Sequence, residues 1–520
     1  MEIRSSSASR SARRAGLMAL AALVATIPLG GLVTIPLARA EILWPIYYGL
    51  GVLALALLWR SGLWRCLEGV LFFAFWAVLA SWSGFALRIS PDPALGALEL
   101  RALFACAIVS TFVVVACRGS QSGVWALRAG WLLGMGATCV IGIWEILTRQ
   151  HLWVTAAKPW PFGPGTVPAA TFINPNNFSV ALIGMLVAAL ATFASTRQTG
   201  LKLLAVVSGA VAVVLVAFTE SRAGLLGLFV VFALEAYRRL TDAAQGSSPV
   251  SVLRSRLNAR RGATVGVLAA AAAVVVTTFT VPALAVRNPL RTMLTDAFAE
   301  ETIRSDSLRI NLITTALGYL RDSHWLGTGA GSFEPILWND PNSGIDVDTN
   351  LHNAFVELLS QYGVIVFLPL AALLLALAWR AARTVVVSSA EGSPNEPDPI
   401  AAMVHTQSGA ATKAVLASEA LTSSVVGAGV STAHTAFGVP LAHELPTTAV
   451  AGSPQLPAEP ASQRALPARR RVLGTELLGY LAAYVLLGIT ASSALAQQIW
   501  WLMLASCLTC AWQLHRARSH

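Results

Sequence analysis

A series of long apolar segments, which recurs from near the N-terminus almost to the C-terminus, constrains this chain more than any other feature. A run of about twenty apolar residues is long enough to cross a bilayer as a helix. By this measure the sequence predicts about twelve membrane-spanning helices. They lie near residues 15–37, 42–59, 66–87, 97–117, 123–147, 172–194, 201–218, 223–237, 262–284, 353–379, 473–495 and 498–514. We therefore expect an all-α, polytopic membrane protein.

Composition and charge support this class. Of the 520 residues, 55% are hydrophobic and only 12% are charged, and the mean hydropathy is +0.64, which is unusual for a soluble domain. The net charge of +10 comes from short basic clusters between the apolar runs. Most clusters lie in connections on the side of the N-terminus, so the positive-inside rule predicts an inner-membrane protein with both termini in the cytoplasm and no nucleic-acid partner.

The same reading divides the chain into five regions. They are helices 1–9 over residues 1–284, a large periplasmic loop domain between helices 9 and 10 over 285–351, helix 10 over 352–380, a cytoplasmic insertion over 385–471, and helices 11–12 with a cytoplasmic tail over 472–520. The insertion is rich in Ala, Ser, Thr and Pro and poor in aromatic residues, which predicts disorder.

Two polar residues lie at the predicted outer ends of spans. Arg222 belongs to a tight outer turn, 219–224, and charged groups at membrane depth are usually paired or functional; the alternative is that it snorkels or pairs with Glu220. His352 directly precedes the apolar run that begins at Asn353. An imidazole there could act as a general base, although a lone histidine at a helix end is more often a polar cap.

The predicted loop domain contains an amphipathic helix that starts near Arg304 and runs to about Leu320. Arg304 and Arg309 are five residues apart and do not share a helix face, so each either binds its own partner or lies on a solvated surface. The glycine-rich segment 327–333 follows a helix rather than a strand, unlike a nucleotide-binding loop. We interpret it as a flexible turn near an active site.

A possible metal motif in the same loop is weak. Asp346 and Asp348 form a D-x-D sequence, but two acids at this spacing are common in loops. The motif therefore gives little support for a metal site.

Four stretches, in this order, resemble the O-antigen ligase and polymerase superfamily of bacterial membrane glycosyltransferases. They are Thr171-Phe172-Ile173-Asn174-Pro175-Asn176-Asn177, the Ser221-Arg222 turn, the Arg309 helix that ends in Gly327-Thr328-Gly329-Ala330-Gly331-Ser332-Phe333, and Leu351-His352-Asn353 followed by Glu357 and Gly363. Each motif alone is weak, but the ordered set is fairly specific. The insertion over 385–471 departs from the family pattern.

The resemblance implies transfer of a glycan from undecaprenyl diphosphate to an acceptor on the periplasmic face, with lipid A core favoured and a growing glycan as the alternative. Arg222 and Arg309 would bind the diphosphate and His352 would be the catalytic residue, while the choice between Arg304 and Arg309 stays open. It also implies membrane lipid as a partner and a reaction without metal or cofactor. The supporting residues that it implies are Asn174, Asn176, Gly329, Gly331 and Glu357.

Other functions fit parts of the pattern. The same fold would serve a polysaccharide polymerase or a ligase that glycosylates protein, and no clear acceptor-binding signature decides between them. From a different class, a flippase or transporter of lipid-linked sugar would carry polar groups near the bilayer midplane. Here the spans are poor in charge, with Glu145 and Glu235 toward helix ends, which favours an enzyme that acts at the outer surface.

Overall fold

The structure is a computed structural model that describes residues 7–153, 167–172, 174–244, 300–341, 351–390, 461–490 and 494–517. The chain divides into two compact units. The first comprises Met1–Ser388 with Ala468–His520, and the second is Ser389–Pro467. The predicted ninth span, 262–284, and most of the predicted insertion, 385–471, lie outside the described residues.

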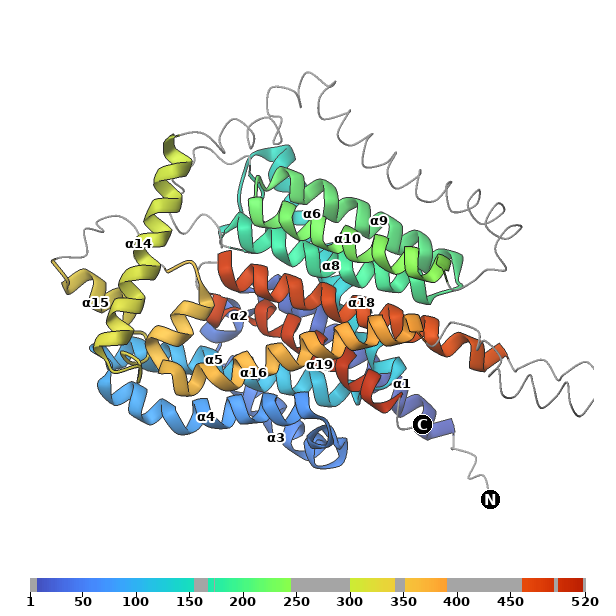
Figure 1. Ribbon diagram of the computed structural model, residues 1–520, viewed down its shortest axis with the longest axis horizontal. Coiled ribbons are helices and arrows are strands. Elements are labelled where there is room, and N and C mark those ends of the chain that lie inside the picture. Colours follow the sequence, from blue (N-terminus) through green and yellow to red (C-terminus); the bar gives the residue numbers. More distant parts are fainter. Residues whose placement is uncertain are drawn as a thin grey trace, which may run out of the picture. The chain divides into compact units, whose positions relative to one another are not determined.

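All regular secondary structure in the described ranges is helical (Figure 1). The α-helices are α1 (Ser7–Thr26), α2 (Gly31–Arg39), α3 (Leu43–Ser61), α4 (Leu67–Ile89), α5 (Pro93–Cys117), α6 (Gln121–Thr148), α8 (Pro175–Ser195), α9 (Thr199–Phe218), α10 (Arg222–Ala244), α14 (Glu300–Asp322), α15 (Phe333–Asn339), α16 (Ala354–Ala390), α18 (Ala461–Thr490) and α19 (Gln498–Arg516). Short 3-10 helices are η1 (Ile27–Leu29), η2 (Leu63–Arg65) and η3 (Ala494–Ala496).

Nine helices of the described part are long and apolar enough to cross a membrane. The prediction of an all-α, polytopic membrane protein is therefore confirmed, although these nine do not establish the count of twelve. Two further predicted spans, 223–237 and 498–514, coincide with α10 and α19, which fall outside those nine. The charged residues Glu235, Arg238 and Arg239 make α10 less apolar, and polar residues near both ends of α19 do the same there.

The prediction of one continuous first span over 15–37 is wrong. The candidate span ends at Leu29, and the chain passes through η1 and Gly30 before α2 begins. Pro28 lies in η1, where it lacks the amide that would continue the helix. Gly30 has a φ of 46°, so the break takes a conformation that glycine adopts readily.

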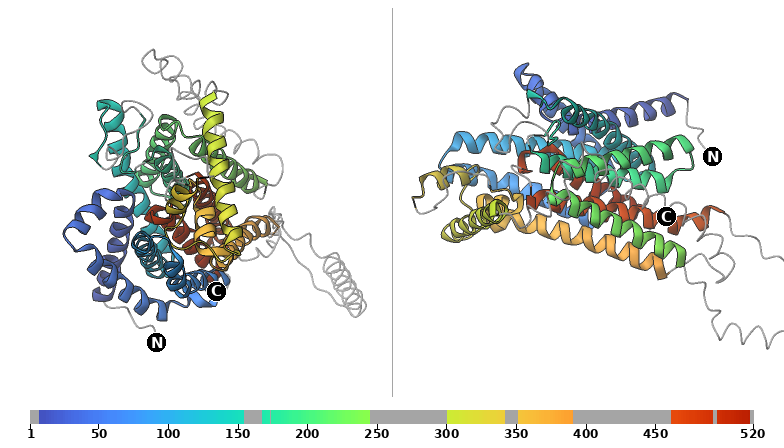
Figure 2. Two further views of the ribbon diagram at one scale, coloured as in Figure 1. Left: turned by 90° about the vertical axis from the view of Figure 1, so that its left-hand side faces the viewer. Right: turned by 90° about the horizontal axis from the view of Figure 1, so that it is seen from above.

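The helices of the first unit run up and down beside one another (Figures 1 and 2). Short connections join α8, α9 and α10 into antiparallel neighbours. Helix α14 lies across one end of this bundle, where α15 and the first turns of α10 and α16 also lie. We call this the α14 end; Figure 2, left, looks onto it.

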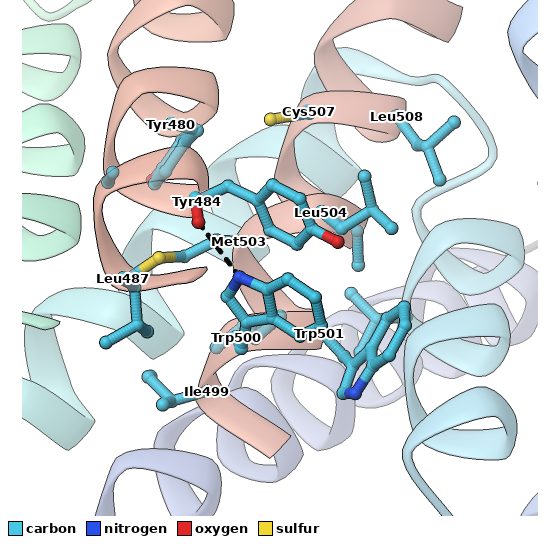
Figure 3. Close-up of a cluster of buried hydrophobic side chains, with 14 of the residues drawn as sticks. Tyr480, Tyr484, Leu487, Ile499, Trp500, Trp501, Met503, Leu504, Cys507 and Leu508 are labelled. Carbon is cyan, nitrogen blue, oxygen red and sulfur yellow. Dashed lines mark hydrogen bonds between the residues drawn. The ribbon is translucent and has the colours of Figure 1, made fainter. Parts of the chain in front are cut away.

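Helices α18 and α19 form the centre of the bundle, and nearly all of α19 is buried. Figure 3 shows Tyr484 of α18 stacked on Trp500 of α19, with ring centroids 4.5 Å apart. The indole Nε1 of Trp500 donates a hydrogen bond of 2.9 Å to the carbonyl of Tyr484. Aromatic stacking and a satisfied indole N–H hold these two helices in register.

Two ion pairs, one buried and one partly buried, tie distant helices together at the end opposite α14. Arg128 of α6 forms a bidentate pair with Glu476 of α18, with Nη2–Oε2 at 2.6 Å and Nε–Oε1 at 2.8 Å. Arg380 of α16 likewise donates to both carboxylate oxygens of Glu68 in α4. The helices thus carry more paired charge than we predicted from the sequence.

Candidate functional site

The connection between α14 and α15 contains the glycine-rich segment 327–333. Its backbone amides donate to carbonyls of α16 and α4: Thr328 N to Ser360 O at 2.9 Å, Gly329 N to Gln361 O at 2.9 Å and Ala330 N to Ala86 O at 3.0 Å. The prediction of a flexible turn is therefore wrong, because this segment is a fixed connection that fastens α14 and α15 to the bundle.

Gly329 is essential to this docking. Its φ of +109° is one that L-residues rarely adopt, and a Cβ there would lie 2.7 Å from the backbone of Ser90 at the end of α4. Gly363 of α16 makes a second close contact: its φ of +78° interrupts the helix, and a Cβ there would collide with the carbonyl oxygen of Leu326. Glycines at both positions let two backbones meet directly.

We predict that Gly329→Ala destabilises the first unit by about 1–3 kcal/mol, the usual cost of a strained backbone conformation. The measurement is the free energy of unfolding in mixed detergent micelles. Gly318→Ala is the matched control, because Gly318 lies in α14 with nothing within 4 Å of the position that an alanine methyl group would occupy and alanine favours a helix. Equal stability of the two variants would contradict the prediction.

His352 lies two residues before the start of α16 and is partly exposed, with a φ of +50°. The next residue, Asn353, caps the helix: its Oδ1 accepts hydrogen bonds of 3.1 Å from the amides of Phe355 and Val356. Leu351 on the other side is buried. A cap and a buried anchor therefore fix the backbone on both sides of the imidazole.

Helix α14 packs onto this same segment. A small apolar core joins α14, α15 and the residues around His352; its buried members are Leu312, Ala316, Phe333, Leu337 and Leu351. Arg309 is half-buried and adjoins Leu308, which packs against this core. Arg304 lies in the first turns of α14, and its side chain is outside the described part. The structure thus brings the helix of Arg309 to the segment of His352.

The hydroxyl of Tyr319 fastens α14 to the end of α15. It donates a hydrogen bond of 2.7 Å to Oδ2 of Asp340. Burial and this carboxylate raise the pKa of Tyr319 above its ordinary value. The phenol therefore stays protonated and keeps donating at any physiological pH.

The Asn174–Asn177 segment begins α8. Asn174 is its N-cap, with Oδ1 accepting from the amide of Asn176 at 2.8 Å. The amides of Ala169 and Ala170, a few residues before Asn174, donate hydrogen bonds of 2.9 and 2.6 Å to the buried carboxylate of Glu145 at the end of α6. The segment is therefore held from both sides, and Asn174 has at least a structural role.

Arg222 is the first residue of α10 and is exposed. Ser221 is buried and caps the helix by accepting from the amide of Gly224 at 3.2 Å. A Cβ at Gly224 would come within 2.8 Å of Ser179 in α8. The Arg222 turn therefore lies beside the first turns of α8.

The four motif segments thus form two pairs. The Asn174 segment adjoins the Arg222 turn, and the glycine-rich segment with α14 adjoins His352. Helix α18 runs between the pairs, since Gly479 packs against α8 and Gly488 against Phe355 of α16. All four belong to the α14 end.

A cavity of about 300 Å³ opens beside the His352 segment. Its walls come from α5, α15, the start of α16 and η3; they are Leu95, Leu98, Glu99, Ala102, Gly331, Phe333, Glu334, Leu351, Glu357, Gln361, Leu495 and Ala496. Two supporting residues of the prediction, Gly331 and Glu357, are among them. Among the residues that the structure describes, the lining is apolar apart from three carboxylates and one amide, and none of these side chains is basic.

Hydrogen bonds orient the polar groups of this cavity. The hydroxyl of Tyr362 donates to Oε1 of Glu99 at 2.8 Å. Gln361 accepts from the amide of Gly331 at 2.6 Å through its Oε1, and its Nε2 lies 3.5 Å from Oε1 of Glu357. The glycine-rich segment therefore also positions side chains of the cavity.

Sequence reasoning missed Glu99, Glu334 and Gln361. Glu99 gave a usable signal, because a carboxylate inside an apolar span is costly unless it has a partner or a function. Glu334 and Gln361 gave none, since only the tertiary fold brings α15 and α16 to α5.

In the part of the chain that the structure describes, no group of three or more His, Cys, Asp or Glu side chains is placed to hold a metal ion. Asp346 and Asp348 lie outside that part.

Two comparisons with known proteins bear on this arrangement. Residues 204–371 match the O-Antigen ligase family, a region that includes Arg222, Arg309, His352 and Glu357. The teichuronic acid biosynthesis protein TuaE of Bacillus subtilis (strain 168) is 24% identical over 299 residues, which are 58% of this chain and 57% of TuaE. The chain thus spans little more than half the length of this relative. The predicted resemblance is confirmed: residues 204–371 of this chain match the O-antigen ligase domain.

Proposed function

We propose that the protein is a glycosyltransferase of the O-antigen ligase type that moves a glycan from undecaprenyl diphosphate to an acceptor hydroxyl. The observation that supports this most is the packing of α14, which carries Arg309, onto the segment of His352 within the matching region. We further propose that the α14 end faces the periplasm of a bacterial inner-membrane protein and that both termini are cytoplasmic. Lipid A core is the favoured acceptor and a growing glycan the alternative.

The reaction needs three groups. The acceptor oxygen attacks the anomeric carbon of the donor sugar, and the bond from this carbon to the diphosphate oxygen breaks. His352 takes the proton of the acceptor hydroxyl. The electron pair leaves with the diphosphate, whose growing negative charge Arg222 and either Arg309 or Arg304 stabilise, because guanidinium groups match phosphate oxygens geometrically.

The test is transfer by the purified protein in nanodiscs from an undecaprenyl diphosphate-linked glycan to a panel of acceptors, with a chelator present. We expect chelator-resistant transfer, because the proposed step uses no metal. The productive acceptor would distinguish a lipid A core ligase from a polymerase or a protein ligase. Translocation of the carrier without transfer to any acceptor would overturn the proposal in favour of a flippase.

We predict that Arg222→Lys lowers kcat/KM for the carrier by about tenfold, because lysine keeps the charge but loses the bidentate fork. The measurement is the initial rate of transfer at varied carrier concentration. Arg321→Lys is the control, since Arg321 is exposed on α14 and pairs with Asp322. An Arg222→Lys protein as active as this control would remove Arg222 from the diphosphate site.

A further inference from the structure

We infer that the cavity between α5, α15 and α16 binds the acceptor sugar and selects one that is uncharged and rich in hydroxyls. This inference rests on the proposed function and adds to it the acceptor's chemistry. The cavity lies beside the segment of His352. Leu351 lines the cavity and immediately precedes His352, so a sugar bound there lies beside the segment that carries the residue proposed to take its proton.

The size and the walls of the cavity suit a sugar. A volume of about 300 Å³ is at the lower end of the range of small-molecule sites, which combine apolar walls with a few placed polar groups. Leu95, Leu98 and Phe333 provide apolar wall for the C–H faces of a sugar ring. These residues lie on two different helices, so the cavity is a feature of the tertiary fold.

The polar groups of the cavity select for hydrogen-bond donors. Carboxyl oxygens accept hydrogen bonds, and Glu99 of α5 and Glu357 of α16 provide them in the lining. Sugar hydroxyls are donors that each of these groups can bind. Hydrogen bonds from Tyr362 and Gly331 orient Glu99 and Gln361 before any ligand arrives, which lowers the cost of binding.

The same groups exclude anions. The lining residues that the structure describes include no Arg, Lys or His, so among them a phosphate or uronate would find no counter-ion and would face the oxygens of Glu99 and Glu357. The carrier's diphosphate therefore does not belong in this cavity. The arginines of α10 and α14 would bind the diphosphate instead, so the charged carrier and the uncharged acceptor sugar would occupy different sites.

The experiment measures binding without transfer. Full-length protein in nanodiscs is titrated with methyl glycosides of glucose and galactose and, in parallel, of glucuronic acid, and saturation-transfer NMR reports binding. We expect the neutral glycosides to bind and the glucuronide to bind at least about tenfold more weakly. A glucuronide that binds wild type as tightly as the neutral glycosides would overturn the inference.

Three variants sharpen the test. The double variant Glu99→Gln with Glu357→Gln keeps the shape of both side chains and an accepting oxygen on each. We expect it to bind neutral glycosides more weakly, and we expect the ratio of the affinities for neutral glycoside and glucuronide to fall by about tenfold. Ala102→Phe should block both by filling the cavity. Asp322→Asn, an exposed carboxylate of α14, is the control for charge alone. Unchanged binding in both the Ala102→Phe and the double Gln variant would overturn the inference.

The outcomes distinguish a failure of the inferred sugar site from a failure of the proposed function. If glycosides bind and Ala102→Phe blocks them while no acceptor is glycosylated, the cavity is a sugar site and the proposed function is wrong. If transfer occurs and depends on Arg222 but not on Ala102→Phe, the function holds and the cavity is not the acceptor site.

Discussion

Replacing His352 by asparagine will lower the rate of glycan transfer by a factor of about 10² to 10⁴, the usual contribution of a general base. Asparagine is the right replacement because His352 has a φ of +50°, and asparagine tolerates this left-handed conformation better than alanine does. The loss of rate therefore reports the imidazole and not the backbone. The measurement is a single-turnover assay with carrier-linked glycan and saturating acceptor.

His324→Asn provides a control of the same kind. His324 also has a positive φ, of 57°, and lies in the connection that follows α14, but the proposed step does not use it. We expect this variant to transfer at the wild-type rate. If His352→Asn retains more than about a tenth of the wild-type rate, proton transfer by His352 is not part of the mechanism.

The sequence predicted the helical class well because each span carries its own signal. Twenty apolar residues need lipid or a protein interior whatever surrounds them, so α4, α5 and α9 lie close to their predicted ranges. Breaks within a span are harder to predict. The run over 15–37 looks continuous in composition, and only the local chemistry of Pro28 and Gly30 ends the helix early.

The site was predictable only in part. Arg222 and His352 lie at helix starts, as their positions before apolar runs suggested. The cavity was not predictable, because Glu99 and Glu357 are far apart in sequence and meet only when the glycine-rich segment docks against α4 and α16. Gly329 was identified as a motif residue from the sequence. Why glycine is needed there became clear only from the structure, in which the backbone of Gly329 packs against that of Ser90.

The buried pair of Arg128 and Glu476 leads to the largest expected effect on stability. Their side chains are only 3% and 0% exposed, and Arg128 also donates to Ser195 Oγ at 3.1 Å. Removing one member leaves a buried charge without its counter-ion, which typically costs about 3–5 kcal/mol. We therefore predict that Arg128→Met lowers the free energy of unfolding in mixed detergent micelles by this amount.

A double variant tells whether that loss of stability comes from the uncompensated carboxylate of Glu476 or from the lost bidentate contact. If the cost comes from the uncompensated carboxylate, Arg128→Met combined with Glu476→Leu should recover most of it, because an apolar pair of similar volume is often neutral in a buried site. Arg321→Met is the control: its partner Asp322 is exposed, and exposed pairs contribute about 0–1 kcal/mol. If the double variant is as unstable as Arg128→Met, geometry rather than charge makes this pair important, since the bidentate contact would then be what holds α6 against α18.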